Sequence, residues 1–229
     1  RTHEGNKLQI QTHINPSTLI FNDTIWQMSP SDISYCEKQI EINDFEISHA
    51  PQYILIDGIA SNREEDELKI QLNDVDLDYI FGTLNIKNVT FGGNATGNLL
   101  ATHLLTGAPR LSTEQFDVKD FSYNEAIFGD LHLFSMWDND NQGILMKGFI
   151  ENKEDKQTYI DGYIFPTKDS LSLSFDPDKL NIAFLRPFVS TVMSDISGIA
   201  SGHIDFFGRF KALNVTGDAY VENLDFGIE

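Results

Sequence analysis

Apolar and polar residues alternate along most of this chain. An apolar residue at every second position, with mostly polar residues between, predicts β-strands that bury one face. Turn-forming pairs such as Asn73-Asp74, Gly92-Gly93 and Asp176-Pro177 separate the alternating runs. Short strands separated by turns at such regular intervals predict an all-β fold. The clearest runs are Leu68-Ile70-Leu72, Val75-Leu77-Tyr79-Phe81, Leu131-Leu133 and Leu171-Leu173-Phe175.

Two segments depart from this period. The charged run 62–67 has no apolar residue and predicts a solvated hairpin tip between two strands. In the segment 187–195, apolar residues fall at helical spacing behind Pro187, a residue suited to a first helical turn. We therefore expect one short amphipathic helix there, covering or flanking a body built from strands.

An internal repeat extends the picture. Residues 93–99 (GNATGNL) align with residues 198–204 (GIASGHI) at an offset of 105, and the same register continues without a gap to Asp120-Phe121 and Asp225-Phe226. Glycines also stand at the entry of alternating runs, for example Gly129 and Gly162, as at the corners of a curved sheet. Repeats of this kind must stack on their neighbours, which predicts an elongated, curved, repetitive sheet of groove-like or solenoid-like form.

The composition of the chain argues against several classes of function. The 229 residues, enough for one large β-domain or two ordinary ones, carry a formal charge of −19, which opposes binding to nucleic acid. This charge also opposes docking on anionic lipid, although it allows acyl chains to be buried on an apolar surface. A single cysteine, Cys36, excludes an intramolecular disulfide and a cysteine-based zinc site. The chain starts without methionine and stops within a strand pattern, so we expect an interior segment whose targeting or anchoring part lies outside it.

Catalytic and metal-binding patterns are weak. The histidines lack metal-binding spacing, and no Gly-x-Ser-x-Gly elbow occurs. The acidic segment 138–143 resembles a calcium loop but lacks the closing glutamate, which favours a polar hairpin. Asp74, Asp76 and Asp78 alternate on one strand face and are the remaining catalytic candidates, although a solvent-facing role explains them more simply. We expect no enzyme activity, no catalytic residues, no cofactor and no metal.

Several motifs together suggest a family. They lie in residues 76–97, 121–130 and 184–202, and include the runs DLDYIF, LNIKNVTFGGNATG and FSYNEA. They resemble the C-terminal β-repeat region of TamB, the inner-membrane-anchored subunit of the translocation and assembly module, and its AsmA-like relatives. The resemblance covers residues 68–229, whereas residues 1–67 match only in strand rhythm and form a separate or continuous β-rich segment.

This resemblance implies a fold and a setting. TamB and AsmA-like proteins are described as long, taco-shaped β-grooves with an apolar concave side. Membership implies a periplasmic location in a Gram-negative envelope, an inner-membrane anchor outside this segment and a BamA-type outer-membrane barrel as partner. Two roles are attributed to the family, namely phospholipid transport between the membranes and assistance to outer-membrane protein assembly. The sequence does not choose between these roles.

If the chain is such a groove, alternating apolar residues are expected to line it and to bind phospholipid or other acyl cargo. The same residues would instead form a sealed core if the sheet closed on itself. A different class of function, a surface adhesin or glycan-binding β-domain, would use aromatic residues such as Trp137 and Tyr163. The expected lining residues are Leu99, Leu131, Leu133, Ile144, Met146, Leu171, Leu173, Phe175, Ile204 and Phe206.

Overall fold

The computed structural model describes residues 2–4, 7–21, 23–79, 91–106, 108–123, 126–154, 156–186 and 195–227. Almost all regular structure in these residues is antiparallel β-strand, so the all-β prediction is confirmed. The chain forms two compact units. Unit 1 comprises Arg1–Val75 and Ala95–Phe116, and unit 2 comprises Asp76–Asn94 and Asp117–Glu229.

Unit 1 is an antiparallel sheet in which each described strand has mainly consecutive neighbours. β2 pairs with β5, and β5, β6, β7 and β8 follow one another, while the β3–β4 hairpin pairs with the end of β6. The expected boundary between residues 67 and 68 falls inside this unit, because β8 pairs with β7. Its complete strands are β1 (Thr2–Glu4), β2 (Lys7–Ile14), β3 (Ser17–Phe21), β4 (Thr24–Met28), β5 (Ser31–Cys36), β6 (Gln39–His49) and β7 (Gln52–Ala60).

Three further strands contribute residues to both units. They are β8 (Leu68–Asp76), β9 (Phe91–Thr102) and β10 (Arg110–Tyr123). Only Asp76 of β8 belongs to unit 2, whereas β9 is divided after Asn94 and β10 after Phe116.

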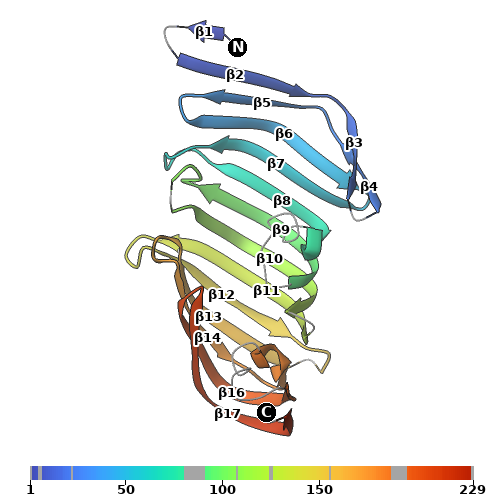
Figure 1. The fold of residues 1–229 in the computed structure, drawn as a ribbon, viewed down its shortest axis with the longest axis vertical. Coiled ribbons are helices and arrows are strands. Elements are labelled where there is room, and N and C mark those ends of the chain that lie inside the picture. Colours follow the sequence, from blue (N-terminus) through green and yellow to red (C-terminus); the bar gives the residue numbers. More distant parts are fainter. Residues whose placement is uncertain are drawn as a thin grey trace. The chain divides into compact units, whose positions relative to one another are not determined.

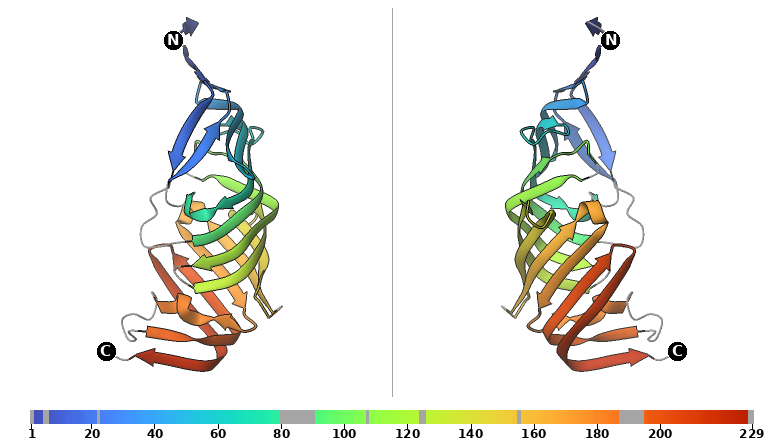
Figure 2. Two further views of the ribbon diagram at one scale, coloured as in Figure 1. Left: turned by 90° about the vertical axis from the view of Figure 1, so that its right-hand side faces the viewer. Right: turned by 90° about the vertical axis from the view of Figure 1, so that its left-hand side faces the viewer.

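In unit 2 the antiparallel strands follow the order β11, β12, β13, β14, β16 and β17 in Figure 1. The short β15 pairs with β16 on the same edge as β14. This sheet is strongly curved, because β15 also contacts β11, and Figure 2 shows its strands from either side. Its elements are β11 (Ala126–Asp138), β12 (Gly143–Glu151), β13 (Gln157–Phe165), η1 (Pro166–Lys168), β14 (Ser170–Asp176), β15 (Leu180–Asn181), η2 (Ile182–Leu185), β16 (Asp195–Arg209) and β17 (Ala212–Gly227).

The strand expected over residues 75–81 is confirmed at Val75 and Asp76 but is wrong for residues 77–79. β8 ends at Asp76, and Leu77–Tyr79 are helical. The backbone N–H of Asp78 donates to the Asp76 carboxylate at 2.9 Å, so Asp76 caps the helical turn. An aspartate that captures a backbone donor two residues later favours a turn over an extended strand. Residues 80 and 81 lie outside the described residues.

The amphipathic helix expected over 187–195 also lies outside the described residues, apart from Asp195, where β16 begins. The described segment before it is the 3₁₀ helix η2. Asn181 caps η2, because its side-chain oxygen accepts from the backbone N–H of Ala183 at 2.9 Å.

The charged run between β7 and β8 forms a loop, as expected, but it is not wholly solvated. Asp66 is only 6% exposed, and the Arg63 guanidinium binds its carboxylate at 2.8 Å. Hydrogen bonds from Arg63 and then from Ser61 lower the pKa of Asp66. An ion pair fixed by neighbouring donors thus holds one carboxylate of this run inside unit 1.

The internal repeat is present but is not free of gaps. Gly93 and Gly198, 105 residues apart, both have positive φ, and a Cβ at either would meet a Cγ1 of Val118 or Val221 respectively. These valines are 103 residues apart, as are the next positive-φ residues, Asp120 and Asn223. The first strands of the two hairpins therefore align at 105 and the second strands at 103, because the connection between β16 and β17 is shorter than that between β9 and β10.

Candidate functional site

The candidate site is one face of the unit 2 sheet, which we call the apolar face. Cross-strand pairing places Leu133, Gly148, Ile160, Phe175 and Ile204 in one continuous row across β11, β12, β13, β14 and β16. Neighbouring rows on the same face are also predominantly apolar. One consists of Ser135, Met146, Gly162, Leu173, Phe206 and Val215, and the other of Trp137, Ile144, Ile164, Leu171, Gly208 and Leu213.

The opposite face, which we call the polar face, has a different chemistry. Lys147 pairs with Asp161 at 3.4 Å between β12 and β13. Two histidines, His132 and His203, hydrogen-bond through Nδ1 to carboxylates on neighbouring strands at 2.7 and 2.6 Å. Aromatic rings are interspersed, since Phe149 packs between His132 and the exposed Tyr159. The alternation in the sequence therefore separates an apolar face from a mixed polar and aromatic one.

Glycines in the apolar rows allow the strands to approach closely. A Cβ at Gly148 would lie 2.1 Å from the His132 carbonyl oxygen and 2.9 Å from Leu133 Cδ2. Gly162 has φ 147°, and a Cβ there would lie 2.1 Å from the Ser172 carbonyl oxygen. No larger residue fits such contacts, so these glycines permit the curvature of the sheet. This agrees with the corner role expected for Gly162.

Nine of the ten expected lining residues lie on this face, and the tenth, Leu99, belongs to unit 1. The nine differ in how far solvent can reach them. Four are buried, with 5–7% of their surface exposed, namely Leu131, Ile144, Ile204 and Phe206. The other five are partly exposed, namely Leu133, Met146, Leu171, Leu173 and Phe175, and so is Leu99.

Part of the apolar face is covered by the chain itself. The segment Leu180–Leu185, formed by β15 and η2, contacts both β11 and β16. Within it Ile182 is 2% exposed and packs with Ile196 and Ala200. This end of the apolar face is therefore protein core, whereas the partly exposed residues lie on β11, β12 and β14.

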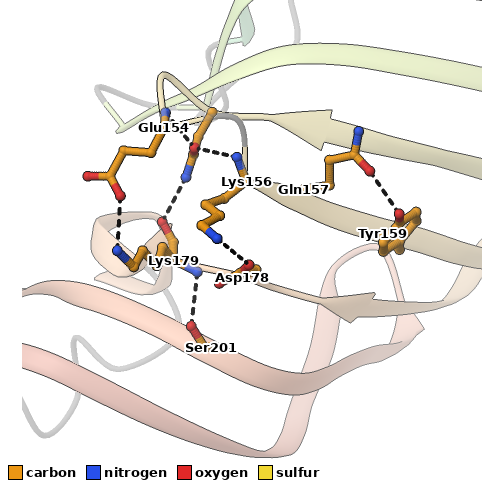
Figure 3. A network of polar contacts seen from close by, with 8 residues as sticks. Glu154, Lys156, Gln157, Tyr159, Asp178, Lys179 and Ser201 are labelled. Atoms are coloured by element: carbon orange, nitrogen blue, oxygen red, sulfur yellow. Dashed lines mark hydrogen bonds and ion pairs between the residues drawn. The ribbon is translucent and has the colours of Figure 1, made fainter.

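A set of polar contacts, the turn clasp of Figure 3, joins the β12–β13 turn to the residues that precede β15. The Asn152 side-chain amide donates to the Lys179 carbonyl at 3.2 Å, and Lys179 Nζ binds Glu154 at 3.0 Å. Lys156 Nζ lies 3.7 Å from Asp178, and the Lys179 backbone N–H donates to Ser201 Oγ at 3.0 Å. Because exposed ion pairs stabilise little, the clasp chiefly fixes where β15 and η2 begin.

Unit 1 has an apolar face of its own that the expected lining residues did not include. Pairing aligns Ile10, Tyr35 and Ile40 in one row, and Ile33 and Ile42 in the next. Ile10 is 36% exposed and the other four are partly exposed. The alternation of Leu8-Ile10 and Ile40-Ile42 was the available signal for these residues.

Three apolar-face residues of unit 2 were also missed. Ile150, Ile160 and Ile164 stand in the same rows as the expected residues. In each case a glycine interrupts the apolar series, as Gly148 does between Met146 and Ile150. These residues would have been predicted if glycine had been counted as an apolar-face position in the alternation.

The other candidates have structural explanations. In the 138–143 hairpin the Asp138 carboxylate accepts from the side chain and backbone of Asn141, from the Tyr163 hydroxyl and from the Asp140 backbone. These bonds lower the pKa of Asp138 to about 2. Among the described residues, no group of three or more His, Cys, Asp or Glu side chains is placed to hold a metal ion.

Trp137 and Tyr163, the aromatic residues expected to bind glycan in the alternative function, lie on opposite faces of the sheet. Trp137 stands opposite Ile144 on the apolar face, and its indole N–H donates to Asn139 at 3.1 Å. Tyr163 is on the polar face, where its ring stacks on Phe165. These two residues therefore do not form one platform.

Of the helices in the described part of the chain, none has the length and apolar character to span a membrane. Comparison with protein-family models, with curated proteins and with solved structures found no match.

Proposed function

We propose that this chain is a TamB-like segment of a cell-envelope protein, and that its apolar sheet faces shield lipid acyl chains between the inner and outer membranes. The observation that supports this most is the row structure of unit 2. Across five neighbouring strands, apolar residues and glycine fill nearly every position of one face, while the other face mixes charged and hydrogen-bonded residues with apolar ones such as Leu145 and Phe149. The motif resemblance of residues 68–229 supplies the family and the envelope setting.

Exposed apolar surface gives the physical reason for binding. Burying one methylene group yields about 0.8 kcal/mol, so an acyl chain laid along several partly exposed side chains needs no specific headgroup contact. Leu133, Met146 and Leu173 are suitable contacts, because each is apolar and only partly buried. The buried end beneath β15 and η2 contributes stability rather than cargo contacts.

Paired substitutions on one strand test the proposal. Met146→Asp places a charge on the apolar face, whereas Leu145→Asp places the same charge next to it on the polar face, where Leu145 is also partly exposed. We expect Met146→Asp to weaken binding of a fluorescent fatty acid about tenfold or more, equivalent to about 1.4 kcal/mol. Leu145→Asp should bind as the unsubstituted protein does.

Circular dichroism and thermal unfolding of both variants control for misfolding. If Met146→Asp does not fold, Leu173→Ser makes the same test with a neutral side chain. Equal affinity for the probe in the Met146 and Leu145 variants would contradict the proposal, as would absence of probe binding by the unsubstituted protein.

The periplasmic location and the BamA-type partner rest on the resemblance and belong to the same proposal. Native mass spectrometry after mild, detergent-free purification addresses the choice between the two family roles. Co-purified phospholipid favours lipid transport. Protein that carries no phospholipid but binds an unfolded outer-membrane protein favours assembly.

A further inference from the structure

The strand β14 differs from its neighbours β13 and β16 in how continuously solvent reaches its apolar side. Its three apolar-face residues, Leu171, Leu173 and Phe175, are all partly exposed, and we call this series the β14 path. On each of β11, β12, β13 and β16, the same three rows include at least one buried residue. These buried residues are Ser135, Ile144, Ile160, Ile204 and Phe206.

Glycines flank the β14 path on both sides. Gly162 of β13 stands opposite Leu173, and Gly208 of β16 stands opposite Leu171. Because glycine has no side chain, each leucine has one flank that no directly opposite side chain occupies. An alkyl chain laid along β14 can therefore contact both the tops and the flanks of these leucines.

One end of the β14 path is closed by protein core. Beyond Phe175, whose ring packs edge-on against Phe206 at 5.3 Å between centroids, the chain continues through the buried Pro177 to β15. Leu180 of β15 is 4% exposed. An alkyl chain that follows β14 must therefore end near Phe175. The next row at this end of the face is also buried, with 2–5% exposure, and consists of Leu131, Ile150 and Thr158.

The other end of the β14 path is open and carries basic residues. Arg209 stands opposite the first residue of β14. The turn before β14 and the turn after β16 are joined, because the Phe210 backbone N–H donates to the Asp169 carbonyl at 3.0 Å. Lys168 and Lys211 lie in these two turns, and both are exposed, as is Arg209. We call Lys168, Arg209 and Lys211 the basic turn residues.

The charges of the basic turn residues are not neutralised by ion pairs. None of the three binds a carboxylate of a described residue, whereas Lys147, Lys156 and Lys179 elsewhere in unit 2 each do. Asp169 is the one carboxylate of the two joined turns, so three positive charges accompany one negative charge. The acidic β11–β12 turn is at the same end of the strands but three strands away from β14. The open end of the path therefore attracts anions.

The length of the β14 path suits one acyl chain. From Leu171 to Phe175 there are four residue steps, which span about 13 Å at roughly 3.3 Å per residue. The hydrocarbon of one bilayer leaflet is about 15 Å deep, half of a core of about 30 Å. A chain of this length aligned with β14 extends from the closed end to the basic turn residues.

We propose that the β14 path holds one acyl chain of an anionic amphiphile, with its methyl end toward Phe175 and its head group at the basic turn residues. This inference rests on the proposed function, because it requires acyl chains to bind on the apolar face. A charged head at the closed end would lose its water without gaining a partner, whereas at the open end it stays hydrated near three cations. The cargo class is a fatty acid or lipid with a carboxylate or phosphate head.

Fluorescence quenching from two places on β14 measures the orientation. In Cys36→Ser protein, bimane is attached through either Leu171→Cys or Phe175→Cys. The added stearic acid carries a nitroxide next to its carboxylate or next to its methyl end. We expect the carboxylate-end probe to quench position 171 more than position 175, and the methyl-end probe to show the reverse. Circular dichroism checks each labelled protein, and Leu173→Cys replaces Phe175→Cys if the latter does not fold.

Neutralising the basic turn residues tests the head-group contact. The triple variant Lys168→Gln, Arg209→Gln and Lys211→Gln should weaken binding of stearic acid about tenfold at low salt and less at high salt. Binding of stearyl alcohol, which has no charge, should stay the same. Lys153→Gln is the matched control, because Lys153 is an exposed lysine of the β12–β13 turn at the opposite end of the strands. It should bind both probes as the unsubstituted protein does.

Two competitors identify the source of the anionic group. A lysophospholipid with one acyl chain should displace labelled stearic acid. Inorganic phosphate at the same concentration should not, because it has a head group without an acyl chain.

The outcomes separate this inference from the proposed function. Absence of quenching by both probes at both positions would contradict acyl binding and the orientation together. Equal or reversed quenching patterns would overturn the orientation while acyl binding stands. Equal losses of acid and alcohol binding in the triple variant, or displacement by phosphate alone, would overturn the head-group contact.

Discussion

The two units share one pattern but differ in what covers it. In both, cross-strand rows gather apolar residues on a single face. In unit 2, β15 and η2 lie against β11 and β16, and Ile182 beneath them is 2% exposed. In unit 1, the row residues Ile33 and Ile42 remain partly exposed and Ile10 is 36% exposed, although the same rows continue to the buried Ala60 and Leu68.

This difference separates two properties of an apolar face. Alternation along each strand decides which side of a sheet is apolar. A covering segment, which comes from elsewhere in the chain, decides whether that side is core or remains reachable. An apolar row can thus serve stability at one end and binding at the other.

The largest effect should come from the covered region. Ile182→Ala removes a side chain that packs in the cluster with Ile196 and Ala200, and we expect it to destabilise unit 2 by about 2–5 kcal/mol. Ile33→Ala makes the same truncation at a partly exposed position of unit 1, where about 1 kcal/mol is expected. Hydrogen exchange during denaturant unfolding measures each unit separately. Equal losses would contradict the distinction between covered and reachable rows.

A smaller effect is expected where strands approach closely. Gly148→Ala directs a methyl group at the His132 carbonyl oxygen, a backbone atom that cannot move without its strand. We expect a loss of about 1–3 kcal/mol in the free energy of unfolding of unit 2. Ser172→Ala, on the exposed polar face, is the control and should be nearly neutral. A neutral Gly148→Ala would show that curvature does not depend on this contact.

The smallest effect concerns pH. A hydrogen bond that the His203 ring donates to the Asp176 carboxylate raises the pKa of His203, and Asp205 and the directly opposite Asp218 lie on the same face. Because the folded pKa lies above the unfolded value of about 6.5, the contribution is complete below that pH and is lost as pH rises through the folded pKa. The stability difference between the protein and His203→Gln should therefore be larger at pH 5.5 than at pH 8.5, measured by urea unfolding. A difference that grows with pH would contradict this assignment.

Much of the fold could be predicted from the sequence because a period of two is a local property. Strand identity and the apolar side of β11, β12, β14 and β16 follow from it, while the repeat was visible in the match between residues 93–99 and 198–204. The end of β8 could not be predicted in this way, because the Asp76 cap competes with an alternation that continues through Tyr79. The shift from 105 to 103 in the repeat was hidden because chance matches such as Phe121 and Phe226 fitted the ungapped register.

The accessible part of the site was harder to predict. Leu131 and Leu133 have the same place in the alternation, yet Leu131 is 5% exposed and Leu133 is partly exposed. β11 contacts β15 and η2, which lie more than forty residues along the chain, and a local pattern does not record such contacts. Burial of Asp66 has the same origin, since its Arg63 partner and loop geometry override a run of charges.

Fluorescence quenching tests the central claim most directly, namely that acyl chains lie on the apolar face. A Cys36→Ser protein carries one bimane-labelled cysteine, introduced by either Met146→Cys or Leu145→Cys, and receives fatty acid with a spin label on its acyl chain. We predict saturable quenching at position 146 and little at position 145. Equal quenching at both positions, or none at 146, would contradict the claim.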